Sequence, residues 1–298
     1  MEKSKLGTTS LELSRIGLGT WAMGGGGWKF GWGPQDDKLS QAAIARAVEL
    51  GINWIDTAPL YGLGHAEEVI GRALRHLSEK PLIATKFGIL WDAKRSMSHC
   101  LKKQSVKSEL EASLRRLKVE AVDLYQMHWP VPEEDIEEAW AAAGDLVKEG
   151  KARFIGVSNV SVAQLEKLKN IHKPASAQLP YSLVNRGIEK EILPYCAKEN
   201  IGVIVYGVLE KGLLTGEFSK ERIEKLPMDD HRKRDPAFLE PELSKNLEAA
   251  GNLKAEALKT GLNPAELAIT EVLKNPSVCA AIIGARSPEQ VEENVESV

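Results

Sequence analysis

Four side chains that can donate or hold a proton follow short apolar segments of the kind that form β-strands. Asp56 and Tyr61 lie in INWIDTAPLYG, Lys86 ends LIATK, and His128 ends DLYQMH. A carboxylate, a phenol, an ammonium group and an imidazole placed at three consecutive strand ends predict one shared proton-transfer site. These four residues are the candidate catalytic residues.

Tyr61 is the candidate general acid of this site. A free tyrosine has a pKa of about 10, and a nearby ammonium group stabilises the phenolate and lowers that value. We expect Lys86 to act on Tyr61 in this way, with Asp56 holding the lysine charged and oriented. His128 would hydrogen-bond a substrate oxygen or relay the proton, which suits protonation of a carbonyl oxygen. Because no protein side chain supplies hydride, the hydride must come from a cofactor.

Eight short β-rich segments alternate with amphipathic stretches, which predicts repeated βα units. The expected strands cover residues 15–20, 52–57, 82–86, 122–128, 153–159, 176–181, 202–208 and 280–284. Eight such units without a strong break favour an α/β fold of the (β/α)8 TIM-barrel type over an open doubly wound sheet. We expect residues 1–298 to form this barrel as a single domain, preceded by a hairpin over residues 5–14. The strand ends would then converge at one mouth.

Two segments are longer than a βα connection requires. Residues 19–37 are rich in Gly and Trp, and residues 217–245 are charged and contain three prolines. Long loops in compact folds are usually lids or binding loops, or else disordered linkers, and composition leaves both interpretations open for 217–245. The HRKR run at 231–234 is expected to be a solvated surface rather than a phosphate site.

The composition restricts the class of partner. The chain has 298 residues, 43% hydrophobic and 27% charged, with a net charge of −3, so it offers no basic field to nucleic acid or an anionic membrane. Three scattered cysteines show no metal-ligand spacing, and no run reaches the ~18 apolar residues of a membrane span. We therefore expect a cytoplasmic protein without a metal, a monomer or weak homo-oligomer, whose partner is a small molecule.

Nucleotide-binding signals of the usual kind are nearly absent. Gly17, Gly19 and Ala22 match G-x-G-x-x-A, but further glycines follow where a helix is required. A second candidate lies where a strand passes through Gly284 and Arg286 into a helix that begins near Ser287, because a helix N-terminus beside an arginine can bind an anion. A capped surface helix with a solvated arginine explains the same residues equally well.

The chain resembles the aldo-keto reductases, in particular their bacterial branch, over nearly its whole length. The motifs that carry the resemblance occur in order: GINWIDTAPLYGLGHAEEVIG, ATKFG, SLRRLKVEAVDLYQMHWP, GKARFIGVSN, YSLVNR and KGLLTG. This resemblance implies a (β/α)8 barrel that binds NADP(H) and reversibly reduces aldehydes or ketones. It also implies that Tyr61 is the general acid, that Lys86 and Asp56 lower its pKa, and that His128 positions the carbonyl group.

The resemblance further implies a cofactor site. Ser158, Asn159 and Gln178 would bind the nicotinamide carboxamide, Tyr206 would stack on the ring, and Arg286 would meet the 2′-phosphate, which favours NADP over NAD. The full set of expected cofactor-binding residues is Gly19, Thr20, Trp21, Asp56, Ser158, Asn159, Gln178, Tyr206, Gly207, Leu209, Lys211, Gly212, Leu214, Gly216, Gly284, Arg286, Gln290, Glu293 and Asn294. The expected substrate-binding residues are Trp21, Tyr61, His128 and Trp129.

Two features depart from the family pattern. Gly207, Val208 and Leu209 follow Tyr206 where many relatives have Ser-Pro-Leu, so a serine hydroxyl near the pyrophosphate is missing. Relatives also commonly continue with a further helix beyond the segment EEN. The stretch LPMDDHRKRDPAFLEPELSKN, in contrast, resembles the cofactor-covering loop of the family and favours a functional lid.

Other functions remain open from the sequence. The same site suits a sugar or polyol dehydrogenase that works in the oxidative direction. A cofactor-sensing binding module resembling the potassium-channel β-subunits is a second possibility, and an aldolase with Lys86 as Schiff-base nucleophile is a third. Trp21, Trp28, Trp32 and Trp129 would suit an aromatic substrate pocket, although we expect packing roles for at least half of them.

Overall fold

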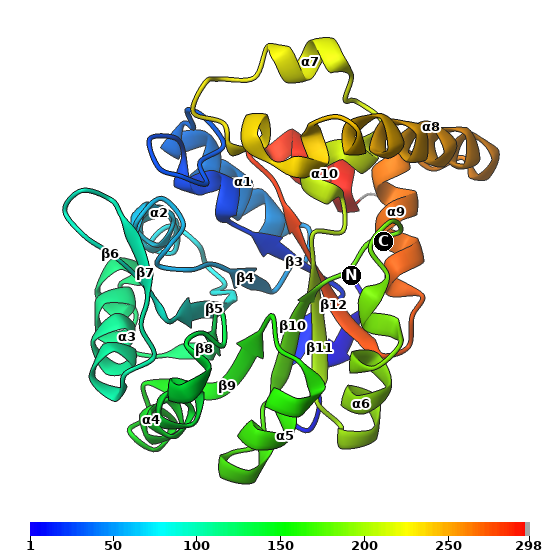
Figure 1. The fold of residues 1–298 in the computed structure, drawn as a ribbon. Coiled ribbons are helices and arrows are strands. Elements are labelled where there is room, and N and C mark those ends of the chain that lie inside the picture. Colours follow the sequence, from blue (N-terminus) through cyan, green and yellow to red (C-terminus); the bar gives the residue numbers. More distant parts are fainter. Residues whose placement is uncertain (296–298) are drawn as a thin grey trace.

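The computed structural model describes residues 1–295, which form a closed barrel of eight parallel strands with helices outside it (Figure 1). Around the barrel the strands follow the order β10, β11, β12, β3, β4, β5, β8 and β9. Their bounds are β3 Ile16–Gly19, β4 Trp54–Asp56, β5 Leu82–Phe87, β8 Val122–Met127, β9 Ala152–Ser158, β10 Ser176–Pro180, β11 Gly202–Tyr206 and β12 Val278–Gly284. All eight strands expected from the sequence are present, and the (β/α)8 TIM-barrel fold is confirmed.

Ten α-helices occur in the part of the chain that the structure describes. They are α1 Asp37–Glu49, α2 His65–Ala73, α3 Lys103–Leu117, α4 Ile136–Lys148, α5 Val162–Ile171, α6 Ile192–Glu199, α7 Lys220–Glu224, α8 Glu242–Thr260, α9 Pro264–Leu273 and α10 Pro288–Val295. The main core lies between the strands and the helices, where apolar residues at helical spacing, such as Val106, Leu110 and Leu117, are fully buried. None of the helices within residues 1–295 is both long and apolar enough to cross a membrane.

The expected N-terminal hairpin is present and closes the bottom of the barrel. Its strands, β1 Lys3–Lys5 and β2 Glu12–Ser14, pair antiparallel. Leu6 and Leu11 of the hairpin pack against Trp54 inside the barrel. Gly17 makes room for this plug, because a Cβ at that position would lie 2.1 Å from the Trp54 indole. Gly17, the first glycine of the G-x-G-x-x-A match, therefore has a packing role.

The two long loops contact each other over the barrel mouth. The first contains the 3-10 helix η1 Trp21–Gly24, and the second contains α7, η5 His231–Arg234 and η6 Pro236–Phe238, seen above the barrel in Figure 1. Trp32 and Asp230 form an isolated antiparallel β-bridge. The backbone N–H of His231 donates to the carbonyl of Gly31 at 2.8 Å. Residues 217–245 are thus an ordered cover rather than a linker.

The expectation that HRKR is a solvated surface is wrong for its first two residues. His231 and Arg232 are buried. The Arg232 guanidinium lies 4.6 Å from the centre of the Trp32 ring and donates through Nη2 to Asp230 Oδ2 at 2.6 Å. The face of a partly buried tryptophan and a buried carboxylate stabilise this cation away from water.

Candidate active site

Lys86 is the centre of the hydrogen-bond network at the barrel mouth. Its Nζ donates to Asp56 Oδ1 at 2.5 Å, to the carbonyl oxygen of Thr57 at 2.9 Å and to Tyr61 Oη at 3.3 Å. Asp56 ends β4, Lys86 lies near the end of β5, and Tyr61 follows β4 in a short turn. The parallel strands bring these three side chains together, as the sequence indicated.

The pKa of Tyr61 is raised well above its usual value, chiefly by burial and then by the negative charge of Asp56. This direction is opposite to the lowering that we expected from Lys86. Burial of the phenol is the main physical reason, and the carboxylate of Asp56, which lies 2.5 Å from Lys86, adds to it by offsetting the ammonium charge. Tyr61 is consequently a neutral phenol at neutral pH.

His128 directly follows β8 and faces Tyr61. The two ring centres lie 6.1 Å apart in an edge-to-face arrangement. The pKa of His128 is lowered well below its usual value. Desolvation by burial is the largest cause, and the charges of Lys86 and His99 add to it. The imidazole is therefore neutral at neutral pH and can donate one hydrogen bond to an uncharged acceptor such as a carbonyl oxygen.

The second oxygen of Asp56 is held by two glutamine amides. Gln178 Nε2 donates to Asp56 Oδ2 at 2.8 Å, and Gln126 Nε2 donates to the same oxygen at 3.3 Å. The side chain of Gln178 thus contacts the Asp56 carboxylate, a contact that its expected place at the nicotinamide carboxamide did not indicate. Gln126 was missed, although it lies two residues before His128 and on the same face of β8, a spacing that could have revealed it.

Ser158, Asn159 and Tyr206 lie together at the ends of β9 and β11. Tyr206 Oη donates to Asn159 Oδ1 at 2.6 Å, and Asn159 Nδ2 donates to the carbonyl oxygen of His128 at 3.0 Å. Ser158 Oγ donates to the backbone oxygen of Gln178 at 3.0 Å. The residues expected around the nicotinamide are therefore next to His128.

The expected pyrophosphate segment leaves β11 and forms η4 Glu210–Thr215. Gly207 and Gly216 both have a φ of 74°, and the turn between them continues through Lys211 and Gly212 at φ values of 57° and 98°. Lys211 Nζ pairs with Asp235 of the lid at 2.6 Å. The side chains of Leu209 and Leu214 pack into an apolar cluster beneath this turn. Their backbone groups are therefore the part of these residues that a cofactor would contact.

The expected adenosine end lies where β12 meets α10, which begins at Pro288, near Ser287 as expected. Arg286 Nε donates to Gln35 Oε1 at 2.6 Å, and its other nitrogens donate to the carbonyl oxygens of Trp32 and Pro34. Gln290 Oε1 accepts from the backbone N–H of Arg286 at 2.8 Å.

The remaining expected cofactor residues line the same strand ends or lie beside them. Asn294 Nδ2 donates to the carbonyl oxygen of Gly284 at 3.4 Å, whereas Glu293 is exposed on α10 and accepts from Asn263 through its backbone. Gly19 ends β3, and Thr20 Oγ1 donates to the carbonyl oxygen of Asp56 at 3.0 Å.

The four tryptophans of the expected substrate pocket have different positions. Trp21 stacks on Tyr61, with ring centres 6.3 Å apart, and lies 4.8 Å from the His231 ring of the lid. Trp32 lies edge-on to Trp21 at 5.2 Å. Trp28 is buried in a separate apolar cluster, and Trp129 is 42% exposed. Trp21 is thus the tryptophan in ring contact with Tyr61.

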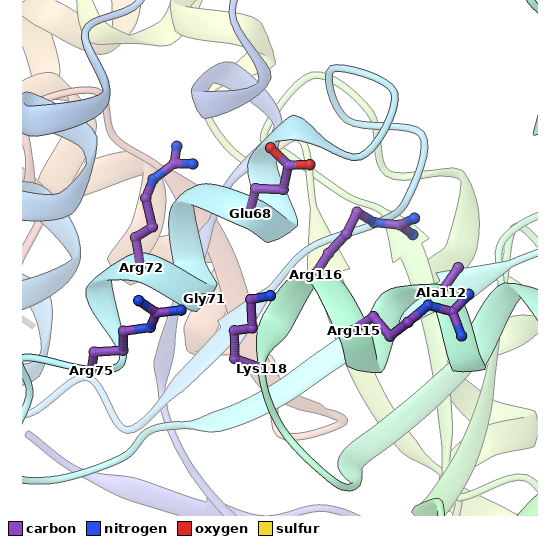
Figure 2. A pocket seen from close by; sticks show the side chains of 8 residues that line it. All are labelled: Glu68, Gly71, Arg72, Arg75, Ala112, Arg115, Arg116 and Lys118. Carbon is purple, nitrogen blue, oxygen red and sulfur yellow. The ribbon is translucent and has the colours of Figure 1, made fainter.

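Two hollows lie close to these elements. One, of about 720 Å³, borders the mouth between the glycine-rich segment 24–27, the turn after Tyr61 and the hairpin of β6 Ile89–Trp91 and β7 Met97–His99. The other, of about 450 Å³, lies outside the barrel between α2 and α3 and is surrounded by arginines and a lysine (Figure 2). Most of these cations lie near the C-terminal ends of α2 and α3, where positive charge offsets the helix dipoles. They are separate from the strand ends.

Comparisons with known proteins place this geometry in a family. The model of the Aldo/keto reductase family matches residues 15–298. The chain is 38% identical to aldo-keto reductase YhdN of Bacillus subtilis, covering 98% of this chain and 87% of that protein. It is 35% identical to the NADH-specific methylglyoxal reductase of Escherichia coli, covering 100% and 94% respectively.

A solved structure gives the same result. The glycerol dehydrogenase AKR11B4 from Gluconobacter oxydans superposes with a TM-score of 0.87 at 39% identity, over 99% of this chain and 89% of that one. Sequence, fold and the residues at the strand ends agree: this chain belongs to the aldo/keto reductase family of oxidoreductases, which use a nicotinamide cofactor.

Proposed function

We propose that this protein is an NADP(H)-dependent carbonyl reductase in which Tyr61 is the general acid. One observation carries the proposal: Asp56, Lys86 and Tyr61 form a continuous hydrogen-bonded chain that ends at a protonated phenol facing a neutral His128. The proposed substrates are small-molecule aldehydes or ketones in the cytoplasm. The proposed assembly is a monomer or weak homo-oligomer of one barrel domain.

The residues divide the chemistry as follows. A bound nicotinamide cofactor supplies the hydride. His128 donates a hydrogen bond that orients the carbonyl oxygen, and Tyr61 gives that oxygen its proton. Lys86, 3.3 Å from Tyr61 Oη, stabilises the phenolate that forms, while Asp56 holds Lys86 in place. The raised pKa of Tyr61 keeps the acid protonated until the reaction draws the proton away.

The strand ends fit a dinucleotide. Gly207 has open space above its Cα, since a Cβ there would meet no atom within 4 Å. Arg286 donates to carbonyl oxygens of Trp32 and Pro34 and has no carboxylate within ion-pair distance in residues 1–295. An arginine without an anionic partner beside the start of α10 suits a 2′-phosphate, which supports NADP(H).

The oxidative direction is a second candidate, because the same site can remove hydride and a proton from an alcohol. It is favoured by the similarity to a solved structure described as a glycerol dehydrogenase. The aldolase alternative has less support. Lys86 is 1% exposed and donates to three oxygen acceptors, so its nitrogen has no free lone pair to attack a carbonyl.

A panel of aldehydes, ketones and dicarbonyls assayed with NADPH and with NADH tests the proposal. We expect Tyr61→Phe to lower kcat by roughly 10²–10⁴-fold, because a positioned acid contributes about that much. Cofactor binding, which the quenching of tryptophan fluorescence measures, should remain. Wild-type rates in Tyr61→Phe would remove Tyr61 as the acid, and a preference for glycerol-like alcohols would favour the dehydrogenase.

A further inference from the structure

We propose that Gln126 is a positioning residue for Asp56, and that Gln178 is shared between Asp56 and the cofactor. This inference rests on the proposed function. Gln126 Nε2 lies 3.3 Å from Asp56 Oδ2, and Gln178 Nε2 lies 2.8 Å from the same oxygen and 3.3 Å from Gln126 Oε1. The three side chains form a closed triangle inside the barrel.

The triangle is shielded from water, so its hydrogen bonds have strong consequences. Asp56 and Gln178 are each 2% exposed, and Gln126 is fully buried. Lys86 occupies Oδ1 of Asp56, while the two amides occupy Oδ2. Because a buried carboxylate requires donors on both oxygens, the amides fix the rotation of the carboxylate and keep Oδ1 directed at Lys86.

The backbone leaves a space for Gln126. On β8 it pairs with Lys86 of β5 on one side and with Gly156 of β9 on the other. A Cβ at Gly156 would lie 3.3 Å from Cγ of Gln126 and 2.2 Å from Oγ of Ser176. The missing side chain at position 156 therefore lets a long amide lie across the barrel interior and reach Asp56.

The sharing of Gln178 follows from its position. It is expected at the nicotinamide carboxamide, and its backbone oxygen already accepts from Ser158 Oγ at 3.0 Å. If its amide turns to the cofactor, Asp56 Oδ2 loses its shorter hydrogen bond. Gln126 then supplies the remaining amide donor to that oxygen, so Asp56 stays aligned during turnover.

The experiment compares Gln126→Met, which removes the amide at similar volume, with the wild type. We expect kcat to fall about tenfold, since a hydrogen bond to a charged group contributes roughly that factor, while the Kd for the cofactor is unchanged. The alkaline limb of the pH–rate profile should move to higher pH, because Asp56 exerts a stronger negative field on Tyr61. Gln178→Met should instead weaken cofactor binding as well.

Tyr125→Phe is the matched control. It removes a buried hydrogen bond, from Tyr125 Oη to the carbonyl oxygen of Val106 at 2.9 Å, on the same strand but away from Asp56. We expect wild-type kcat and pH profile. If Gln126→Met behaves like this control, Gln126 has no positioning role.

A second readout does not need turnover. In protein labelled with ¹³C at aspartate carboxyl groups, the signal of Asp56 is identified by its loss in Asp56→Asn. We expect Gln126→Met to change its chemical shift and Tyr125→Phe to leave it unchanged. An unmoved signal overturns the inference even if the wild type reduces no carbonyl in the panel. An unmoved Asp56 signal can therefore be distinguished from a failure of the proposed function.

Discussion

Lys86 Nζ lies 2.5 Å from Asp56 Oδ1, with side-chain exposures of only 1% and 3%. Neither charge can be lost without leaving the other buried and unpaired, which typically costs 3–5 kcal/mol. The pair consequently contributes to two properties at once. It keeps the positive charge that would stabilise the Tyr61 phenolate in the proposed reaction, and it makes the barrel interior sensitive to single substitutions.

The first prediction concerns Lys86→Met. We expect loss of kcat with cofactor binding largely intact, because the phenolate loses its stabilising charge while the nicotinamide residues stay in place. We also expect the free energy of unfolding to fall by about 3 kcal/mol, since Asp56 is left buried without its cation. Steady-state kinetics and urea denaturation measure the two effects.

The double variant Asp56→Asn with Lys86→Met separates the effect on kcat from the effect on the free energy of unfolding. Removing both charges should restore much of the free energy of unfolding without restoring turnover. Retained activity in Lys86→Met would contradict the role of the lysine in proton transfer.

The fold was largely predictable because each strand is a compact apolar segment that ends at a turn. The four candidate catalytic residues were placed at one mouth by the same rule, since parallel strands bring their carboxyl ends together. In the structure Asp56, Lys86, Tyr61 and His128 meet as that rule requires.

Long-range contacts were not predictable from local patterns. The burial of Arg232 depends on Trp32, which is about 200 positions away in the sequence, so the run HRKR resembled an exposed surface. The raised pKa of Tyr61 depends chiefly on the burial of the phenol and then on the charge of Asp56, and sequence spacing reveals neither burial nor distance. The contact of Gln178 with Asp56 joins β10 to β4 across the barrel interior.

The second prediction concerns Arg286→Ala. We expect a KM for NADPH raised about tenfold or more, because charged hydrogen bonds to a phosphate are lost, and little change for NADH. Initial rates with both cofactors measure this difference. An equal effect on both cofactors would remove the 2′-phosphate role.

Gln35→Leu is the control for this experiment. Arg286 also fixes the first long loop through Gln35 Oε1 at 2.6 Å and the carbonyl oxygens of Trp32 and Pro34. Gln35→Leu loosens that loop while keeping the cation. Its effect on NADPH and NADH should therefore be the same, which distinguishes loop position from phosphate binding.

The third prediction concerns the lid and its buried Asp230. This carboxylate accepts from the backbone N–H, Nε and Nη2 of Arg232 at 3.0, 3.0 and 2.6 Å. We expect Asp230→Asn to leave Arg232 buried without its counter-charge and to favour lid opening. The dissociation rate of NADPH should rise roughly tenfold, equivalent to ~1.4 kcal/mol, and trypsin should cut within residues 222–234 faster.

Lys220→Ala provides the control within the same segment. Lys220 pairs with Glu240 at 2.6 Å, but both side chains are about half exposed, and such pairs contribute little. We expect wild-type NADPH dissociation and lid proteolysis. Equal behaviour of Asp230→Asn and Lys220→Ala would show that the buried pair does not hold the lid.

The fourth prediction concerns the pH dependence of stability. Burial raises the pKa of Glu109 from 4.5 to about 7, although Ser105 and the backbone N–H of Gly88 donate to its carboxylate. Between these two values the folded state binds more protons than the unfolded state, so the contribution of Glu109 to stability falls as pH rises. At ~1.4 kcal/mol per pH unit, the loss amounts to about 3 kcal/mol.

Glu109→Gln removes this titration and keeps an oxygen to accept from Gly88. We therefore expect the variant to gain stability relative to the wild type as the pH rises from 4.5 to above 7. Urea denaturation across this range measures the difference, and Glu111→Gln, an ion-paired position on the same helix, is the control. Parallel stability curves for Glu109→Gln and the wild type would mean that Glu109 titrates normally. If the stability of Glu109→Gln instead rises relative to that of the wild type, the buried Glu109 carboxylate destabilises the folded protein above neutral pH.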